Sequence, residues 1–245
     1  MSEIINHTYY YHKKNEKYSF LITDETKQIA TNCFGINFFI AEDTALSFFY
    51  NLVNPNEKLN IVDIGANVGL YTLYAKYLPN ATFYAYEPMP LNFKILNDNI
   101  KLNNIENVKT FNIAISNEKN TKILNVCKSH CGLHTLGNNP LRFTDIEKIS
   151  VNTDTLDNLF YNRNIKVDFL KIDTEGYEFY ILKGGINTIK TYKPIIQIEY
   201  YVKNMNQCNV DEHDFCKLIH DLDYKIVNKN GSEIIIIPKD FQLNN

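Results

Sequence analysis

Short apolar runs and amphipathic stretches alternate along the chain from residue 59 to residue 201. The first apolar run, residues 59–64, ends in a turn that contains Gly65 and Gly69, and a helical pattern of apolar residues follows. Buried parallel strands are short and rich in β-branched residues, and glycine is needed where the backbone turns sharply or a ligand approaches closely. The pattern predicts a strand, a tight turn and a helix whose N-terminus offers free N–H groups to a ligand.

The later alternation predicts an α/β fold with one mostly parallel sheet. Core strands are expected at residues 59–64, 81–86, 108–115, 167–172, 194–201, 224–228 and 233–238, with an extra strand at 122–127 and a further segment at 149–153 before the fourth core strand. Helices are expected at residues 71–78, 90–102, 177–190 and 211–222, with a short one from Asp154 and a break at Gly184-Gly185. Asn230-Gly231 lies between the last two strands and is a strong hairpin signal. The sheet should therefore have seven strands and a C-terminal antiparallel hairpin.

The first 58 residues follow a different pattern and are interpreted as an extension packed on a core domain of residues 59–245. Strand-like runs at residues 18–23 and 35–41 flank a polar segment and predict a hairpin. Residues 43–53 have a helix cap and helical periodicity, so this helix should cover the edge of the sheet.

The glycine spacing bears on which cofactor binds at the turn. A dinucleotide fingerprint has three glycines, G-x-G-x-x-G, whereas this turn has only Gly65 and Gly69. Asp63, just before the turn, would repel phosphates and suits a ligand with a positively charged amino group, such as S-adenosylmethionine. The next strand ends in Glu87, whose carboxylate can accept two hydrogen bonds from ribose hydroxyls. Both nicotinamide and S-adenosylmethionine sites use such an acid, so Glu87 alone does not separate them.

Further candidate residues follow two other strands. Ligands of open α/β sheets bind outside the carboxyl ends of the strands, so Ser116, after the third strand, should lie beside the adenine. Asp173 and Glu175 follow the fourth strand and should face the same crevice. Glu178 and Glu199 have a competing interpretation as ion-pair partners of a lysine.

Composition and charge narrow the choice of partner and compartment. The 245 residues with 44% hydrophobic content allow one large domain with a small N-terminal extension. The net charge is −3 and no basic tract is longer than Lys13-Lys14, which favours a small-molecule or glycan acceptor over nucleic acid. No apolar segment resembles a signal peptide or a membrane span, which predicts a cytoplasmic protein without membrane insertion.

Five cysteines in a chain of this size are expected to be reduced thiols. Cys127, His130, Cys131 and His134 lie close together and are all potential zinc ligands. Structural zinc sites usually combine two ligand pairs from separate turns, and this cluster leaves little loop to close a tetrahedron. The two histidines are therefore better candidates for the acceptor side of a site.

Four motifs in this order resemble those of the FkbM-type S-adenosylmethionine-dependent methyltransferases: VDIGANVGLYTLYAK, AYEPMPLNFKILNDNIKLN, FLKIDTEGYEFYILKGG and PIIQIEY. The resemblance covers about residues 40–201, and the KID-x-EG-x-E segment is its most specific part. It implies a Rossmann-like class I methyltransferase fold and methyl transfer to oxygen, often a sugar or polyketide hydroxyl. By position it assigns to the cofactor motif Asp63, Gly65, Asn67, Gly69 and Glu87, and to the second signature Asp173, Glu175, Gly176 and Glu178.

Methyl transfer to a hydroxyl requires an aligned acceptor oxygen and removal of its proton. His134 or His130, on the loop at residues 129–144, is the first candidate for the general base, because a neutral histidine is poised for that role near pH 7. Asp173 or Glu175 is the alternative and needs desolvation to be effective. Asp173 with Glu175 or Glu199 could instead hold Mg²⁺ and lower the pKa of the hydroxyl.

Three functional hypotheses follow from the sequence. The leading one is an S-adenosylmethionine-dependent O-methyltransferase that acts on a sugar, a glycan or a similar small polyhydroxylated acceptor. A nicotinamide-dependent oxidoreductase is second and is disfavoured by the missing third glycine. The third is a catalytically inactive interaction module that binds the cofactor.

Overall fold

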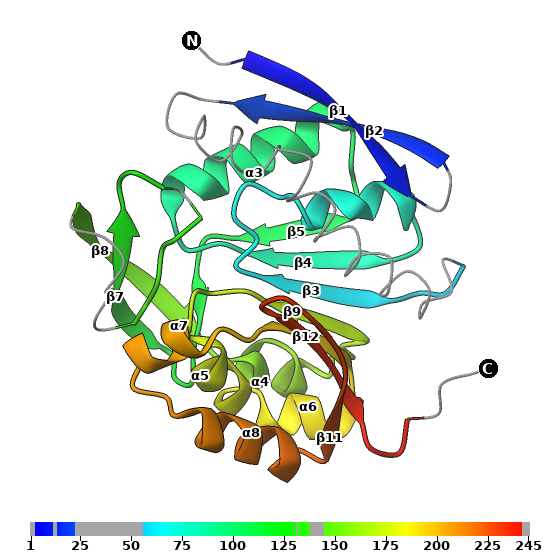
Figure 1. Ribbon diagram of the computed structural model, residues 1–245. Helices are drawn as coiled ribbons and strands as arrows, with labels where there is room; N and C mark the ends of the chain where they lie inside the picture. The colour runs from blue at the N-terminus through cyan, green and yellow to red at the C-terminus, as the bar shows by residue number, and fades with distance from the viewer. Residues whose placement is uncertain (1–2, 12–13, 23–55, 131, 138–144, 242–245) are drawn as a thin grey trace.

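The computed structural model describes residues 3–11, 14–22, 56–130, 132–137 and 145–241, and its largest element is a seven-stranded sheet (Figure 1). The strands lie in the order β11-β12-β10-β9-β3-β4-β5. Their bounds are β3 Asn60–Ile64, β4 Thr82–Tyr86, β5 Val108–Phe111, β9 Phe169–Ile172, β10 Ile195–Glu199, β11 Tyr224–Asn230 and β12 Glu233–Pro238. β5, β4, β3, β9 and β10 are parallel, and the β11–β12 hairpin joins β10 with β12 antiparallel. The predicted seven-stranded sheet with its antiparallel C-terminal strands is confirmed.

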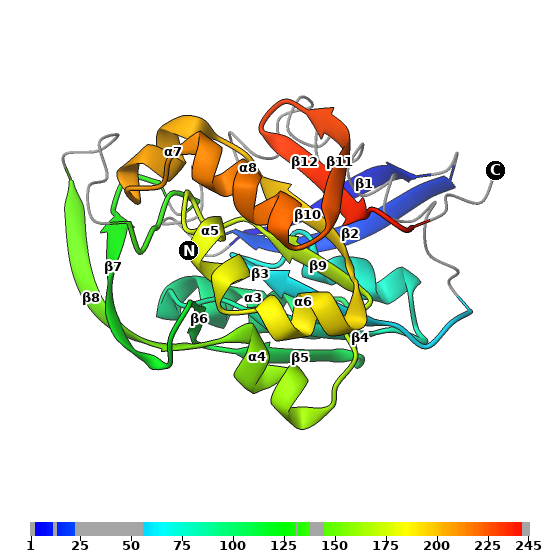
Figure 2. The same ribbon diagram turned by 90° about the horizontal axis from the view of Figure 1, so that it is seen from below.

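Helices cover both faces of this sheet because its strands are apolar on both sides. Along β3, Val62 and Ile64 join a core formed with one group of helices, α4 Leu156–Leu159, α5 Glu178–Lys183, α6 Ile186–Tyr192, α7 Val202–Gln207 and α8 Glu212–Asp221. Several of these helices lie in front of the sheet in Figure 2. Ile61 points to the opposite face, where the 3₁₀ helix η1 (Thr72–Tyr77) supplies the core, and α3 (Pro90–Leu102) packs beside it. The two-residue period of the strand therefore decides which side chains meet which layer.

The third predicted strand is divided, which corrects the expectation of one strand at residues 108–115. β5 stays in the main sheet, whereas β6 (Ala114–Ile115) pairs with β8 (Ile146–Asp154) in a second sheet that also contains β7 (Asn120–Cys127). Between them, the side-chain amide of Asn112 donates to the carbonyl oxygens of Glu87 and Pro88. This long-range anchor explains why the chain leaves the edge of β4 at that point.

Two helix predictions differ from the structure in type or continuity. The helix after the glycine turn is the single 3₁₀ segment η1 rather than an α-helix at residues 71–78. The predicted break at Gly184-Gly185 is confirmed, since it separates α5 from α6. A Cβ on Gly184 would lie 2.1 Å from the carbonyl oxygen of Ser116, so glycine lets this backbone pack directly on the end of β6. α7 and the short 3₁₀ helix η2 (Tyr161–Arg163) were not predicted.

The N-terminal strand β2 (Lys14–Ile22) overlaps the predicted strand at residues 18–23. Its partner in the structure is β1 (Glu3–Tyr11), and the two form an antiparallel hairpin beside α3 (Figure 1). The predicted partner at residues 35–41 and the predicted helix at 43–53 lie outside the described residues. Within the described part of the chain, no helix combines the length and apolar character that crossing a bilayer requires.

Candidate active site

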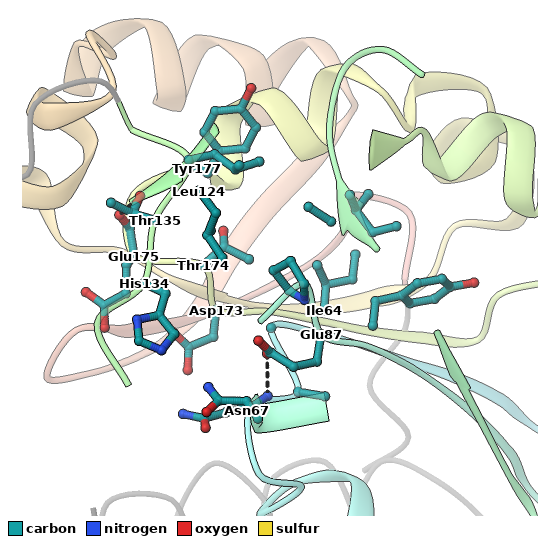
Figure 3. Close-up of a pocket in the computed structure, with 18 of the residues that line it drawn as sticks. Ile64, Asn67, Glu87, Leu124, His134, Thr135, Asp173, Thr174, Glu175 and Tyr177 are labelled. Atoms are coloured by element: carbon teal, nitrogen blue, oxygen red, sulfur yellow. Dashed lines mark hydrogen bonds between the residues drawn. The ribbon is translucent and has the colours of Figure 1, made fainter. Parts of the chain in front are cut away.

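A cavity of about 120 Å³ lies at the carboxyl ends of β3, β4 and β9 (Figure 3). This is the edge at which open α/β sheets bind their ligands. One part of its wall comes from the glycine turn and the end of β4, including Gly65, Asn67 and Glu87. Another part comes from the end of β9 and from the loop after β7, and includes Asp173, Thr174, Glu175, His134 and Thr135. Residues that lie far apart in the sequence are thus brought to one cavity.

The glycine turn is fixed between β4 and β9. The backbone N–H groups of Gly65 and Ala66 both donate to the carbonyl oxygen of Tyr86 at 3.0 Å. Gly65 has φ +77°, and a Cβ at this position would lie 1.9 Å from the carbonyl oxygen of Asp173. Gly69 has φ +99° and would place a Cβ 2.8 Å from Leu96 of α3. Both predicted glycines are therefore required by close backbone or helix packing.

The Glu87 carboxylate joins the glycine turn to the segment that follows β4. Its Oε2 accepts a hydrogen bond from the N–H of Asn67 at 2.8 Å, and its Oε1 accepts one from the N–H of Met89 at 2.9 Å. Burial raises the pKa of this carboxyl to about 7, and the two backbone donors oppose that shift. Each oxygen has a further lone pair, so the carboxylate can hold the turn and still accept hydrogen bonds from a ligand in the cavity.

Asp63 does not lie where the sequence placed it, beside the ligand. Its side chain is completely buried and is not among the described residues that line the cavity. Oδ2 accepts a hydrogen bond from Thr72 Oγ1 at 2.6 Å, and Oδ1 lies 3.8 Å from Lys171 Nζ. Burial raises the pKa of Asp63, and Lys171 partly offsets this effect. In this geometry Asp63 anchors the start of η1 and holds the Lys171 ammonium.

Ser116 is likewise displaced from its expected position beside the ligand. Its hydroxyl is buried, donates to Asn117 Oδ1 at 3.1 Å and lies 3.3 Å from the Tyr177 hydroxyl. The cavity is lined by the preceding segment, Ile113 to Ile115. Because β6 turns into the second sheet, the chain meets the cavity one residue before Ser116.

The loop after β9 is shaped by Glu178, which lies at the start of α5. Its Oε1 accepts hydrogen bonds from the N–H of Thr174, the hydroxyl of Thr174 and the N–H of Gly176, at 2.8, 2.9 and 3.2 Å. Glu178 is fully buried, and burial raises its pKa to about 7. A Cβ on Gly176 would lie 2.2 Å from the carbonyl oxygen of Asn204. Glu178 thus organises the loop by hydrogen bonds, rather than by the lysine ion pair considered from the sequence.

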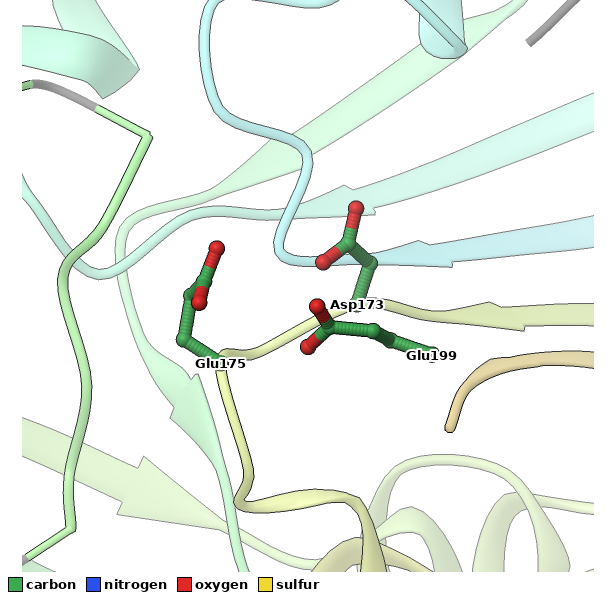
Figure 4. A group of neighbouring side chains, drawn as sticks. All are labelled: Asp173, Glu175 and Glu199. Atoms are coloured by element: carbon green, nitrogen blue, oxygen red, sulfur yellow. The ribbon is translucent and has the colours of Figure 1, made fainter. Parts of the chain in front are cut away.

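This loop presents a cluster of three carboxylates, Asp173, Glu175 and Glu199, which lies near the end of β10 (Figure 4). One oxygen of each lies within 4.8 Å of the others. Asn204 Nδ2 donates to Glu175 Oε2 at 2.7 Å, and Lys171 Nζ lies 3.3 Å from Asp173 Oδ2. Burial, followed by the charges of Asp173 and Glu175, raises the pKa of Glu199 well above its ordinary value. The cluster is therefore suited to accept a proton or to bind a cation.

His134 reaches the cavity from the loop after β7. Its Nδ1 accepts a hydrogen bond from the N–H of Cys127 at 3.2 Å. Burial and the neighbouring His130 lower the pKa of His134 to about 4. The Thr135 hydroxyl donates to the carbonyl oxygen of Glu175 at 2.9 Å, which ties this loop to the loop after β9. The structure thus brings His134 and the strand-end acids to one cavity, as the sequence predicted.

The alternative histidine and the zinc hypothesis have less support. His130 is half-buried, is not among the described residues that line the cavity, and accepts the N–H of Gly132 at Nδ1. Cys131 lies outside the described residues, as do residues 138–144 of the predicted loop. The Cys127 thiol lies near Ser129 and Asp145. Across the described ranges, only Asp173, Glu175 and Glu199 form a group whose ligand atoms could hold a metal ion.

One contributor was missed from the sequence, and another, Lys171, was considered only as an ion-pair partner of Glu178 or Glu199. Lys171 is a buried lysine that lies between Asp63 and Asp173, with its ammonium 5.4 Å from the centre of the Tyr71 ring. A lysine inside an apolar strand was a usable signal, since buried ammonium groups need carboxylate partners. Asn204 lies in the unpredicted α7, and no local pattern marked it.

The fold and the cavity together define a class I methyltransferase domain of the S-adenosylmethionine-dependent type. The chain belongs to the FkbM methyltransferase family, because the family described as "Methyltransferase FkbM domain" matches residues 63–226. Methyltransferase sdnD of Sordaria araneosa is 30% identical over 175 residues, which are 60% of this chain and 68% of that protein. Methyltransferase 1 of Beauveria bassiana (strain ARSEF 2860) is 28% identical over 164 residues, 60% of this chain and 66% of that protein.

A solved structure shows the same fold. The crystal structure of methyltransferase FkbM from Methylobacillus flagellatus KT aligns with a TM-score of 0.50 and 15% identity. The alignment covers 88% of this chain and 55% of that chain, so this chain spans little more than half of that protein.

Proposed function

We propose that this protein transfers the methyl group of S-adenosylmethionine to a hydroxyl oxygen of a sugar, a glycan or a similar small polyhydroxylated acceptor. The observation that carries the proposal is the single cavity, which joins the turn at Gly65 and the Glu87 carboxylate to Asp173, Glu175 and His134. One part of the cavity thus offers polar groups to a cofactor, and the other part offers polar groups to an acceptor. They are called the cofactor half and the acceptor half.

The residues of the cofactor half fit S-adenosylmethionine. A side chain on Gly65 would fill the turn, and the buried Oδ1 of Asn67 has no hydrogen-bond partner among the described residues. A ligand that donates a hydrogen bond would satisfy this oxygen. Glu87 would hold the ribose through its remaining lone pairs. Asp63 and Gly69 would not touch the ligand but would hold the turn in its conformation. Ser116 would support the adenine side from behind Ile115.

The acceptor half must orient the hydroxyl and take its proton. When bound, S-adenosylmethionine supplies a methyl group that is already activated for attack. Asp173 and Glu175 are half-buried and line the cavity, so either carboxylate would be placed to accept the proton of a bound hydroxyl. Several carboxylates are also good acceptors for the hydroxyl hydrogens of a polyol, which supports a polyhydroxylated substrate over an apolar one.

A divalent cation is a second element of the proposal, because Asp173, Glu175 and Glu199 offer the oxygen ligands that Mg²⁺ prefers. A cation held there would lower the pKa of an acceptor hydroxyl. Lys171 already neutralises Asp173, and Asn204 already donates a hydrogen bond to Glu175. Proton transfer to a carboxylate without a metal is therefore the first choice. Turnover that survives a chelator and gains nothing from added Mg²⁺ would exclude the metal.

Calorimetric titration tests the cofactor. We expect S-adenosylmethionine and S-adenosylhomocysteine to bind with micromolar affinity, on the order of −8 kcal/mol, and NAD to show no binding at the same concentrations. The opposite result, binding of NAD alone, would support the oxidoreductase hypothesis and contradict the proposal.

The affinity for S-adenosylhomocysteine should also depend on pH through Glu87. Its pKa of about 7 means that the carboxyl is half ionised near neutrality, and only the ionised form can accept hydrogen bonds from both ribose hydroxyls. Affinity should therefore rise about tenfold from about pH 6 to about pH 8. Glu87→Gln should bind about 1.5–3 kcal/mol more weakly and lose this pH dependence. An equal pH dependence in the variant would rule out the ribose assignment.

The acceptor can be found by mass spectrometry of glycans and sugar nucleotides from cells with the protein, without it, and with Asp173→Asn in its place. We expect a species that is one methyl group heavier only with the wild-type protein. Cofactor binding without any methylated product across a broad panel of acceptors would instead support the inactive-module hypothesis.

A further inference from the structure

The edge of β7 that faces away from β8 carries outward N–H groups, and the two nearest its C-terminal end belong to Asn125 and Cys127. Lys128 donates to Asp145 on the β8 side, so the alternation of the strand turns the N–H groups of Asn125 and Cys127 to the other edge. Asn125 exchanges two backbone hydrogen bonds with Thr135, at 2.9 and 3.1 Å. The next outward donor, the N–H of Cys127, is bound by the His134 imidazole at 3.2 Å. His134 Nδ1 thus takes the position of a backbone carbonyl at the edge of the strand.

This contact fixes which ring nitrogen of His134 carries hydrogen. A backbone N–H can only donate, so Nδ1 must offer its lone pair, and in a neutral imidazole the hydrogen is then on Nε2. The other tautomer would set two N–H groups against each other at the end of β7. The anchor is rigid, because Thr135 is held both by Asn125 and by the Glu175 carbonyl oxygen.

From this geometry we infer that His134 is a fixed-tautomer hydrogen-bond donor that positions the acceptor, and that the hydroxyl proton goes to the carboxylates of Asp173 or Glu175. The inference rests on the proposed methyl transfer and refines its substrate class. A cavity wall with an N–H donor and carboxylate acceptors fits a substrate with two neighbouring oxygens, such as a vicinal diol. One hydroxyl donates to a carboxylate, and the adjacent oxygen accepts from His134 Nε2.

The transfer step is balanced without a histidine base. The acceptor oxygen forms the bond to the methyl carbon, the methyl–sulfur bond breaks, and the sulfur keeps that electron pair as a neutral thioether. The hydroxyl proton passes to the carboxylate, whose negative charge it neutralises. The low pKa of His134, which has its cause in burial and in the neighbouring His130, agrees with a ring that stays neutral throughout.

The tautomer can be measured on the full-length protein by nitrogen-15 NMR of labelled histidines, without any acceptor. We expect His134 to show hydrogen on Nε2 and none on Nδ1 from about pH 5 to about pH 8. The spectrum of His134→Gln assigns its signals. Hydrogen on Nδ1, or a titration near the ordinary histidine pKa, would overturn the inference whether or not the protein transfers methyl groups.

Kinetics with the acceptor identified by mass spectrometry test the positioning role. Glutamine has an amide N–H close to the place of Nε2 but no basic nitrogen, so His134→Gln should keep kcat within about tenfold and leave the pH profile unchanged. His134→Ala should raise KM for the acceptor about tenfold, with the affinity for S-adenosylhomocysteine intact. The exposed His220→Gln on α8 serves as the matched control.

Loss of kcat by about 10² or more in both the glutamine and the alanine variant would identify His134 as the general base and refute the donor role. If no methylated product is ever found, the proposed function fails, while the NMR result still decides the tautomer.

Discussion

Gly65→Ala is expected to destabilise the fold by at least about 3 kcal/mol and to abolish binding of S-adenosylhomocysteine. The new Cβ would lie 1.9 Å from the carbonyl oxygen of Asp173, and the backbone of Gly65 has φ +77°. Asp173 cannot withdraw easily, since its own N–H donates to the Ile64 carbonyl at 3.1 Å. Relief of the clash requires that β3 and β9 separate at the cavity.

Gly231→Ala is a matched control for that prediction. Gly231 also has a positive φ, +59°, but nothing lies within 4 Å of a Cβ built on it. The left-handed conformation alone costs about 1 kcal/mol, which lowers the melting temperature of a chain of this size by about 2–4 °C. Thermal unfolding and calorimetric titration compare the two variants. Equal losses of stability in both would show that close packing at Gly65 contributes nothing.

Asp173→Asn is expected to lower kcat by about 10² to 10⁴, the usual contribution of a general base. The substitution keeps the shape of the side chain but removes the charge that accepts a proton and faces Lys171. The melting temperature should change little, because Lys171 keeps Asp63 as a partner. The measurement is initial rates with the identified acceptor, together with the affinity for S-adenosylhomocysteine.

The half-exposed Asp98→Asn on α3 is the control for Asp173→Asn, since its carboxylate contacts Lys94 and not the cavity. It should leave kcat unchanged. Near-normal turnover of Asp173→Asn, combined with a loss in both His134 variants, would assign the base to His134. If Asp173→Asn is inactive and Mg²⁺ stimulates the wild type, the carboxylates act through a cation.

The main sheet was predictable because its strands are encoded locally. Four of the strands are short apolar runs that end at Gly65, Glu87, Asp173 and Glu199, and the Asn230-Gly231 signal marks the last hairpin. The split between β5 and β6 was not predictable, since it depends on Asn112 bonding to the chain at Glu87 and Pro88. No local pattern announces such a contact between segments about two dozen residues apart.

The candidate site was predicted in its location but not in the direction of every side chain. Asp173, Glu175, His134, Asn67 and Glu87 all line the cavity. Asp63 does not, because in β3 it lies between two residues that face the α5–α8 side and its own side chain points to η1. The two-residue period of the strand predicts this direction for the Asp63 side chain. The position of an acid just before a glycine turn had instead suggested contact with the ligand.

The roles of the remaining acids depended on backbone geometry that the sequence does not show. Glu178 appears in the sequence as one more acid of the DTEGYE segment, yet its partners are N–H groups of that same segment. Those N–H groups converge only because Glu175 and Gly176 adopt positive φ, +57° and +102°. Three-dimensional structure was therefore needed to separate an acid that shapes the loop from acids that face the cavity.

The β6-β8-β7 sheet has a consequence for how such a domain can diversify. It has a small core of its own, built around Leu124, Val126 and Val151, and it lines the cavity through β6, through Leu124 of β7 and through the loop that follows β7. The turn at Gly65 and Glu87 belong to the main sheet and share no strand with it. Mutation and insertion in this loop can therefore change acceptor preference while the cofactor half is inherited intact, so one ancestral scaffold can give rise to lineages with different substrates.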